Sequence, residues 1–170
     1  NHIWQMVSKT AMASSADLVD HHDLDLPIGN ARSVNNRTHA YHAGGEGYPT
    51  GGAHNPPTTG SRNAIQMTTY ATDVSSTNVA VLAVATAGGG SVSGADYGYR
   101  NGIVSTSTGT LQKFSFANDV DASNIGTLTH NKTDSTHSNA SATHGYACGG
   151  AYNDIIESFL FSNEATQTDV

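Results

Sequence analysis

The strongest constraint on the fold of this chain is internal repetition. Four six-residue segments align without gaps, and their first residues are 61, 46 and 45 positions apart. The segments are Trp4–Lys9, Ile65–Tyr70, Leu111–Phe116 and Ile156–Phe161. A period in the mid-forties is typical of one supersecondary unit copied along a chain, with each copy burying its apolar face on its neighbours. Four-stranded propeller blades and related modules have this length, so we predict an all-β fold.

A second repeated marker fixes the phase of the unit. The segment His39–Gly45 matches His144–Gly150, and a degenerate middle copy runs from Tyr97 to Gly102. The two clear copies end in Gly-Gly, which suits a strand end where the backbone needs positive φ or close approach. The extra length of the first full copy lies in a loop insertion, residues 46–63, whose Gly, Pro and Asn residues are typical of irregular surface backbone. We therefore expect one repeat domain, residues 1–170.

The aligned segments also indicate how the units pack. Phe114 and Phe116 share one face of a strand because side chains alternate with period two, whereas Leu111 falls on the other face. The same holds for the segment that begins at Ile156. Apolar residues on both faces predict a sheet that lies between two neighbouring sheets.

Composition argues against several kinds of partner. Only 12% of the residues are charged, the formal net charge is -7, and the seven Lys and Arg residues form no basic stripe. We therefore expect no nucleic-acid partner. The sequence has no apolar run near the roughly 20 residues that span a bilayer, so we expect no membrane span.

The cysteine and histidine residues predict no disulfide and no clear metal site. The single cysteine, Cys148, excludes an internal disulfide, and its position in a strand predicts a small buried side chain. His39 and His144 occupy equivalent repeat positions, which favours packing or hydrogen bonding. The cluster from Asp20 to Asp25, with His21 and His22, has ligand types for a divalent ion. Adjacent histidines in a strand point to opposite faces, so we assign no metal and leave this cluster as an open alternative.

The sequence lacks the common catalytic motifs. It contains no Gly-x-Ser-x-Gly, no phosphate-binding loop and no His-Glu-x-x-His. Asp73 and Asp119 are equivalent in the repeat and fall in turns, where aspartate caps local backbone. We therefore expect no enzyme activity, no catalytic residues and no cofactor.

The segment from Leu111 to Gly150 carries a family resemblance. Its Phe-Ser-Phe-Ala-Asn-Asp, Ser-Asn-Ile-Gly-Thr-Leu and His-Gly-Tyr-Ala-Cys-Gly-Gly stretches resemble the kelch-like repeats of marine bacteriophage virion and tail-fibre proteins. The resemblance covers most of the chain from about Ala40 onward. It implies β-propeller blades and a virion or extracellular location. The kelch tryptophan after the aromatic strand is missing, and Val79 and Ile125 stand nearest to its place.

The blade count predicts a need for partners. The chain opens on the third strand of a unit and gives about three and a half four-stranded repeats, whereas propellers typically close with four or more blades. An open end would expose a strand edge and an apolar blade face. We expect either that another subunit covers the ends, in a ring or a fibre of a homo-oligomer, or that the polypeptide is longer.

These observations together favour a non-enzymatic structural or adhesive protein of a phage virion, such as a tail fibre, an appendage or a capsid decoration. Its partners would be other virion or filament subunits. The contact residues that we expect lie in the loop insertion: Tyr48, His54, Pro56 and Pro57. The alternative is a carbohydrate-binding module for host recognition, with Trp4 and tyrosines as sugar-stacking platforms for a host-surface glycan.

Overall fold

The fold is all-β in the part of the chain that the structure describes, as the sequence predicted. The structure is a computed structural model, and it describes residues 6–9, 19–24, 28–29, 31–47, 63–72, 74–86, 88–104, 106–130, 137–150, 154–164 and 167–169. None of these residues forms a helix. Accordingly, none forms a helix long and apolar enough to cross a membrane.

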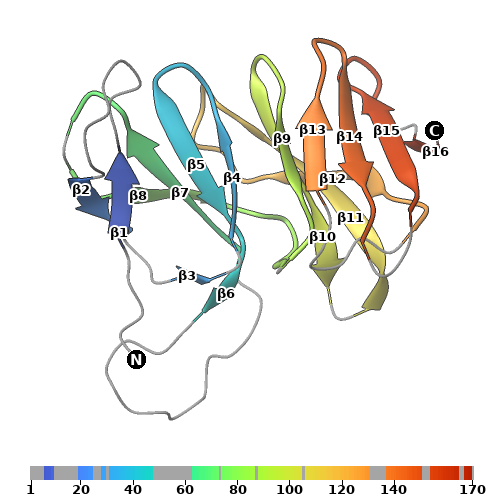
Figure 1. Cartoon of the computed structure of the whole chain (residues 1–170), viewed down its shortest axis with the longest axis horizontal. Coiled ribbons are helices and arrows are strands. Elements are labelled where there is room, and N and C mark those ends of the chain that lie inside the picture. The colour runs from blue at the N-terminus through green and yellow to red at the C-terminus, as the bar shows by residue number, and fades with distance from the viewer. Residues whose placement is uncertain are drawn as a thin grey trace.

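Three four-stranded antiparallel sheets make up most of the described chain (Figure 1). The first sheet has the order β4 (Arg32–Asn35), β5 (His39–Ala43), β7 (Ala64–Thr69) and β8 (Thr77–Val81). The second has the order β9 (Ser91–Ser93), β10 (Tyr97–Val104), β11 (Thr106–Ser115) and β12 (Ser123–Thr127). The third has the order β13 (His137–Ala140), β14 (His144–Cys148), β15 (Ile156–Leu160) and β16 (Gln167–Asp169).

Two further strand pairs precede or interrupt these sheets. β1 (Met6–Lys9) pairs with β2 (Val19–Asp23), and β3 (Ile28–Gly29) pairs with β6 (Glu46–Gly47). β1 contains part of the first aligned segment, whose later copies fall on β7, β11 and β15. The pair β1–β2 therefore corresponds in sequence to the third and fourth strands of a unit.

The register of the three sheets confirms the sequence alignment. The second-strand tyrosines Tyr41, Tyr99 and Tyr146 stand opposite Met67, Lys113 and Ser158, which are equivalent positions of the third strand. A β-bulge also recurs at one place, between Ile65 and Gln66 and between Leu111 and Gln112. The three sheets thus share one register between their second and third strands, and the first two also share the bulge.

The sheets stand in a row with their first strands adjacent. β4 lies against β9, and β9 lies against β13. The amide of Asn35 donates to the hydroxyl of Ser93 over 2.9 Å, and the hydroxyl of Ser91 donates to the carbonyl of Ser33 over 2.9 Å. Figure 1 shows the row running from the blue pair β1–β2 at one end to the orange and red third sheet at the other.

The core consists of two layers between adjacent sheets, and their compositions repeat. Between the first and second sheets lie Val34, Tyr41, Ala43, Ile65, Leu82, Phe114 and Ala122, with Phe116 packed against them. Between the second and third sheets lie Val92, Tyr99, Leu111 and Phe159, with Phe161 packed against them. Leu111 and Phe114 thus belong to different layers, which confirms that the second sheet has two apolar faces. Each layer stabilises the folded chain in proportion to the apolar surface area that it removes from water.

Glycine residues of the second strand make room for the aromatic rings. A Cβ atom on Gly98 would lie 2.5 Å from Cζ of Phe114, and one on Gly145 would lie 2.4 Å from Cζ of Phe159. In the first sheet the equivalent pair is Ala40 opposite Thr68. A side chain is therefore tolerated beside the tyrosine only where the opposite third-strand residue is small.

The Gly-Gly pairs behave as predicted in two of the three units. Gly44 and Gly45 have φ of 69° and 102°, and Gly149 and Gly150 have φ of 66° and 96°. The middle unit differs, because Gly102 lies inside β10, which continues to Val104. Without a second glycine the strand does not break there, and β10 and β11 form a longer hairpin.

Candidate functional site

The contact residues expected from the sequence cannot be placed. Tyr48, His54, Pro56 and Pro57 all lie outside the described residues. Of their loop, only Glu46 and Gly47 in β6 and Asn63 before β7 are described. The loop therefore remains a prediction.

The acidic and histidine cluster falls on β2. Residues 20–23 belong to this strand, whereas Asp25 lies outside the described residues. Among the described residues, no group of three or more His, Cys, Asp or Glu side chains could hold a metal ion.

A polar depression lies where the turns of two adjacent sheets meet. It has a volume of about 590 Å³, is broadly open, and is lined by Asn35, Asn36, Arg37, Thr38, Gly94 and Ala95. These residues come from the end of β4, the β4–β5 turn and the β9–β10 turn. The lining offers amide, hydroxyl and guanidinium groups, which suit hydroxylated ligands and carry no general acid or base.

A side-chain cap fixes the turn that borders this depression. Oδ1 of Asn36 accepts from the backbone amides of Thr38 and His39, each over 2.8 Å. In the third sheet the hydroxyl of Ser141 accepts from the amides of Thr143 and His144, over 3.3 and 3.0 Å. Asn and Ser caps of this kind hold tight turns in place of backbone partners. These caps therefore order the β4–β5 and β13–β14 turns.

The equivalent histidines have the hydrogen-bonding role expected from the sequence. Nδ1 of His39 lies 2.8 Å from the hydroxyl of Thr38, and Nδ1 of His144 lies 2.8 Å from the hydroxyl of Thr143. Each ring also neighbours the tyrosine two residues later, with centroids 6.2 Å apart at Tyr41 and 6.1 Å apart at Tyr146. Both imidazoles thus hold the threonine of the turn that precedes their strand.

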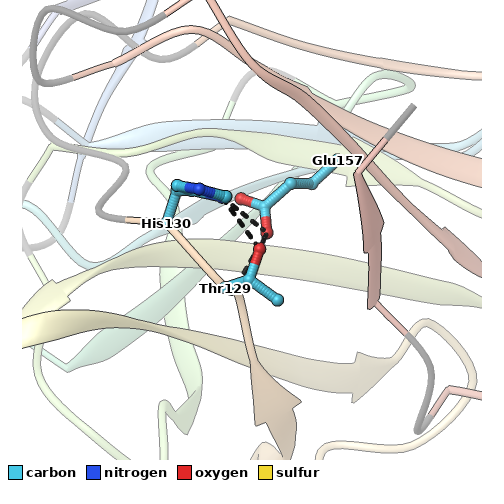
Figure 2. Close-up of polar contacts among 3 residues, drawn as sticks. All are labelled: Thr129, His130 and Glu157. Atoms are coloured by element: carbon cyan, nitrogen blue, oxygen red, sulfur yellow. Dashed lines mark hydrogen bonds and ion pairs between the residues drawn. The ribbon is translucent and has the colours of Figure 1, made fainter.

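Glu157 is a fully buried acid in the third sheet, and its contacts are shown in Figure 2. Its Oε1 accepts from the backbone amide of Thr129 over 2.6 Å and also from the Thr129 hydroxyl. Nδ1 of His130 lies 3.7 Å from the same oxygen and 2.8 Å from the Thr129 hydroxyl oxygen. Because that hydroxyl donates its proton to Glu157, it accepts from His130, which assigns the proton of the imidazole to Nδ1.

This hydroxyl, imidazole and acid do not form a catalytic triad. In a triad the imidazole lies between the other two groups, with one ring nitrogen on the hydroxyl and the other on the carboxylate. Here the same nitrogen faces both, and the hydroxyl donates directly to Glu157. The arrangement orients Glu157 and does not activate Thr129 as a nucleophile.

An equivalent contact in the second sheet shows what Glu157 does. The amide of Val84 donates to Oε1 of Gln112 over 2.8 Å, and Nε2 of Gln112 donates to the carbonyl of Val84 over 3.0 Å. Gln112 and Glu157 occupy the same place on their third strands, and each holds the residue 28 positions earlier in the chain. We call this contact the latch, because it ties each third strand to the loop that follows the preceding sheet.

A buried arginine ties the first two sheets together. Arg100 is fully buried, and its guanidinium donates to the carbonyls of Ala43 over 3.3 Å and Gly90 over 3.0 Å. It also donates to the carbonyls of Gly88 and Asn101. Burial lowers the pKa of Arg100 to about 9, and neighbouring Arg32 adds to this effect. With its donors on backbone carbonyls, Arg100 is a structural cation and not a ligand-binding one.

An ion pair lies beside the core layer between the second and third sheets. Lys113 forms an ion pair with Glu164 in the turn after β15, and its ammonium lies 3.8 Å from the centroid of the Tyr97 ring. The hydroxyl of Tyr99 donates to the same carboxylate over 3.5 Å. Burial and the charge of Glu164 raise the pKa of Tyr99. The turn is thereby attached to the second sheet.

Cys148 departs from the sequence prediction. It is free and only half-buried, because it lies on the outer face of the third sheet. The equivalent Ala43 is buried because the second sheet packs over it.

Arg100, Gln112 and Glu157 were not singled out from the sequence. The recurrence of Gln, Gln and Glu as second residue of the segments at Ile65, Leu111 and Ile156 was a usable signal for the latch. Arg100 gave no such signal, since the equivalent residues are His42 and Ala147.

Comparison with known proteins adds no relative. A scan against protein-family models finds no matching family, and a search of the curated proteins finds no match.

Proposed function

We propose that this chain is a non-enzymatic structural or adhesive subunit of a phage virion or a similar extracellular assembly, built from propeller-like repeats. The observation that carries the proposal is the repetition of one inter-sheet contact, with the same aromatic residues and the same latch in successive units. Such repetition is typical of proteins whose repeats form a scaffold.

The hydrogen bonds of the buried polar side chains support the proposed role as a scaffold. Gln112 and Glu157 hold loops of the preceding sheet, and Arg100 holds the Gly88–Gly90 segment. Buried polar side chains carry a desolvation cost that hydrogen bonding must offset. In this molecule the buried polar side chains offset that cost by hydrogen bonding to backbone groups of a neighbouring sheet or its loop. These bonds join sheets, which is a structural role.

The arrangement of the sheets agrees with kelch-like blades. In a propeller, four-stranded antiparallel sheets stand side by side around a central channel. The adjacent first strands β4, β9 and β13 would line that channel, and the fourth strands would lie outside. A ring would need further blades, which other subunits of a homo-oligomer or a longer polypeptide would supply.

Adhesion would use loops held by this scaffold. The loop with Tyr48, His54, Pro56 and Pro57 is the proposed contact with neighbouring subunits or a host surface. If alanine at Tyr48 and His54 leaves both assembly and surface binding intact, this role of the loop is wrong.

The polar depression favours carbohydrate binding as the second candidate function. Arg37 is exposed, and Asn35 and Thr38 lie beside it with hydrogen-bonding groups that suit a sugar. A host-surface glycan would then be the ligand, and the subunit would serve in host recognition.

A glycan array together with the native mass of the purified chain tests the proposed function. A structural subunit assembles into multiples of 17.6 kDa and gives no specific signal on the array. Saturable binding to one glycan class, lost in Arg37→Ala, would replace the structural role with host recognition. Arg37 suits this test because its side chain is exposed and the change leaves the Asn36 cap intact.

A further inference from the structure

The contact between adjacent sheets has two complementary sides. One side, which we call the socket, is the face with the second-strand tyrosine and the first residue of the aligned segment, such as Tyr41 with Ile65. The other side is the third strand of the following sheet, with its two aromatic residues. Tyr41 meets Phe114 and Phe116 with ring centroids 5.7 and 5.0 Å apart.

The second layer repeats this geometry closely. Tyr99 meets Phe159 and Phe161 with ring centroids 5.2 and 5.0 Å apart. The planes of the stacked pair are 20° from parallel, compared with 26° for Tyr41 and Phe116. The contact is thus a module that the chain uses twice with the same polarity.

The third sheet carries the same socket at the end of the row, and the two core layers of the described residues do not include it. Its residues are Tyr146 and Ile156, in the same places as Tyr99 and Leu111. Ser158 on this face is 5% exposed. Ile156 is 39% exposed, whereas Leu111 and Ile65 are 0% exposed. Leu160 adds a half-buried aliphatic side chain to the same face, opposite His144. Ile156 is thus an exposed aliphatic residue on a face whose counterpart in the second sheet is buried, and such apolar exposure is typical of an interaction surface.

The other end of the row has the matching side. β1 aligns with β7, β11 and β15, each of which is a third strand, and it pairs with β2 as third strands pair with fourth strands. In the alignment Val7 stands at the place of Phe114 and Phe159, and Lys9 stands at the place of Phe116 and Phe161, so β1 offers an aliphatic residue and a lysine stem where the later third strands carry rings. Figure 1 places β1–β2 and the third sheet at opposite ends of the row, so they do not meet within one chain.

We propose that the outer face of the third sheet binds the β1–β2 end of a second copy of this chain, head to tail. The proposal rests on the proposed structural function and names the surface that would serve it. It continues the contact already made twice inside the chain, with a socket on one side and a third strand on the other. A contact between unlike surfaces generates a closed ring if the rotation closes, and a filament if it does not.

The first test is the native mass of the wild type, Ile156→Lys and Val120→Lys across a concentration series. Val120 is the matched control, because it is an aliphatic residue with 63% exposure in the turn after β11, away from the socket. We expect the wild type and Val120→Lys to form multimers, and Ile156→Lys to lose the head-to-tail contact. A lone wild-type monomer at all concentrations would overturn the proposal, and so would an unchanged assembly of Ile156→Lys.

The second test distinguishes unlike from like surfaces. Val7→Asp replaces the aliphatic residue of β1 by a carboxylate and leaves the socket unchanged, whereas Ile156→Lys changes the socket and leaves β1 unchanged. Each variant alone should be monomeric, and an equal mixture should give a heterodimer. If Val7→Asp alone still dimerises and the mixture gives no heterodimer, the sockets bind each other and the proposal is wrong. Circular dichroism of each variant verifies that the sheets are intact.

The outcomes separate this proposal from the proposed function. Assembly that Ile156→Lys does not disturb would leave a structural role intact but through another surface. A monomer that binds one glycan class would remove the structural role itself.

Discussion

The ring of Tyr99 stacks on the ring of Phe161, with centroids 5.0 Å apart and planes 20° from parallel. The two residues belong to adjacent sheets, so this stack is part of what joins them. Offset aromatic pairs contribute about 0.5–1.5 kcal/mol beyond their buried area. The aromatic pairs should therefore stabilise each layer beyond the contribution of its buried area.

Phe159→Ala should lower the free energy of unfolding by about 3–5 kcal/mol, because it removes a buried ring and leaves a cavity. Phe159 is 1% exposed and lies at the centre of the second layer. Urea unfolding followed by circular dichroism measures the change. Val120→Ala, at an exposed turn, should change stability by no more than about 0.5 kcal/mol. Equal losses in both variants would contradict this account of the core.

Gly145→Ala should be destabilised by about 1–3 kcal/mol through overpacking. The new methyl group would lie 2.4 Å from Cζ of Phe159 and 3.0 Å from Cγ2 of Val92. Gly109→Ala is the control within a strand, because its nearest contacts are 3.5 Å away at Leu128. The two melting curves provide the comparison, and a Gly145→Ala protein as stable as Gly109→Ala would show that the ring can move aside.

Glu157→Gln should change stability by less than about 1 kcal/mol, since Gln112 already forms the latch with an amide side chain. Glu157→Leu should cost about 1–3 kcal/mol, because the Thr129 amide loses its acceptor. Hydrogen exchange at the Thr129 amide should accelerate in the leucine variant and not in the glutamine variant. Comparable damage in both would mean that the latch needs the carboxylate charge beside His130.

Arg100→Lys should lower the free energy of unfolding by at least about 1.5–3 kcal/mol, the cost of one lost hydrogen bond to a charged group. The compact ammonium of lysine cannot reproduce the planar fork that meets four carbonyls. Arg32→Lys should lose less, because Arg32 is only half-buried. Chemical denaturation of both variants gives the ranking, and the reverse order would contradict the role of Arg100.

The architecture could be predicted where the sequence repeats itself. The segments that begin at Ile65, Leu111 and Ile156 fall on β7, β11 and β15, since strand alternation places their aromatic residues on one face. The Gly-Gly pair at Gly149 predicted a strand end because positive φ is a local property of the backbone.

Two of the missed features depend on contacts between distant residues, and a third depends on the local sequence. The role of Arg100 depends on the carbonyl of Ala43, which is 57 positions away in another sheet. The half-burial of Cys148 depends on whether a further sheet covers its face, and strand periodicity within one unit does not specify that. The length of β10 depends on the missing second glycine after Gly102, so it could have been read from the degenerate middle copy.

The placement of each sheet between its neighbours also has a consequence for unfolding. The second sheet has cores on both faces, whereas the third has one on a single face. In such repeat arrays the free energy of unfolding is approximately the sum of the intrinsic stability of each unit and the stabilisation from each interface between neighbouring units. In the isolated chain the amide protons of β10 and β11 should therefore exchange last, and those of the third sheet should exchange earlier.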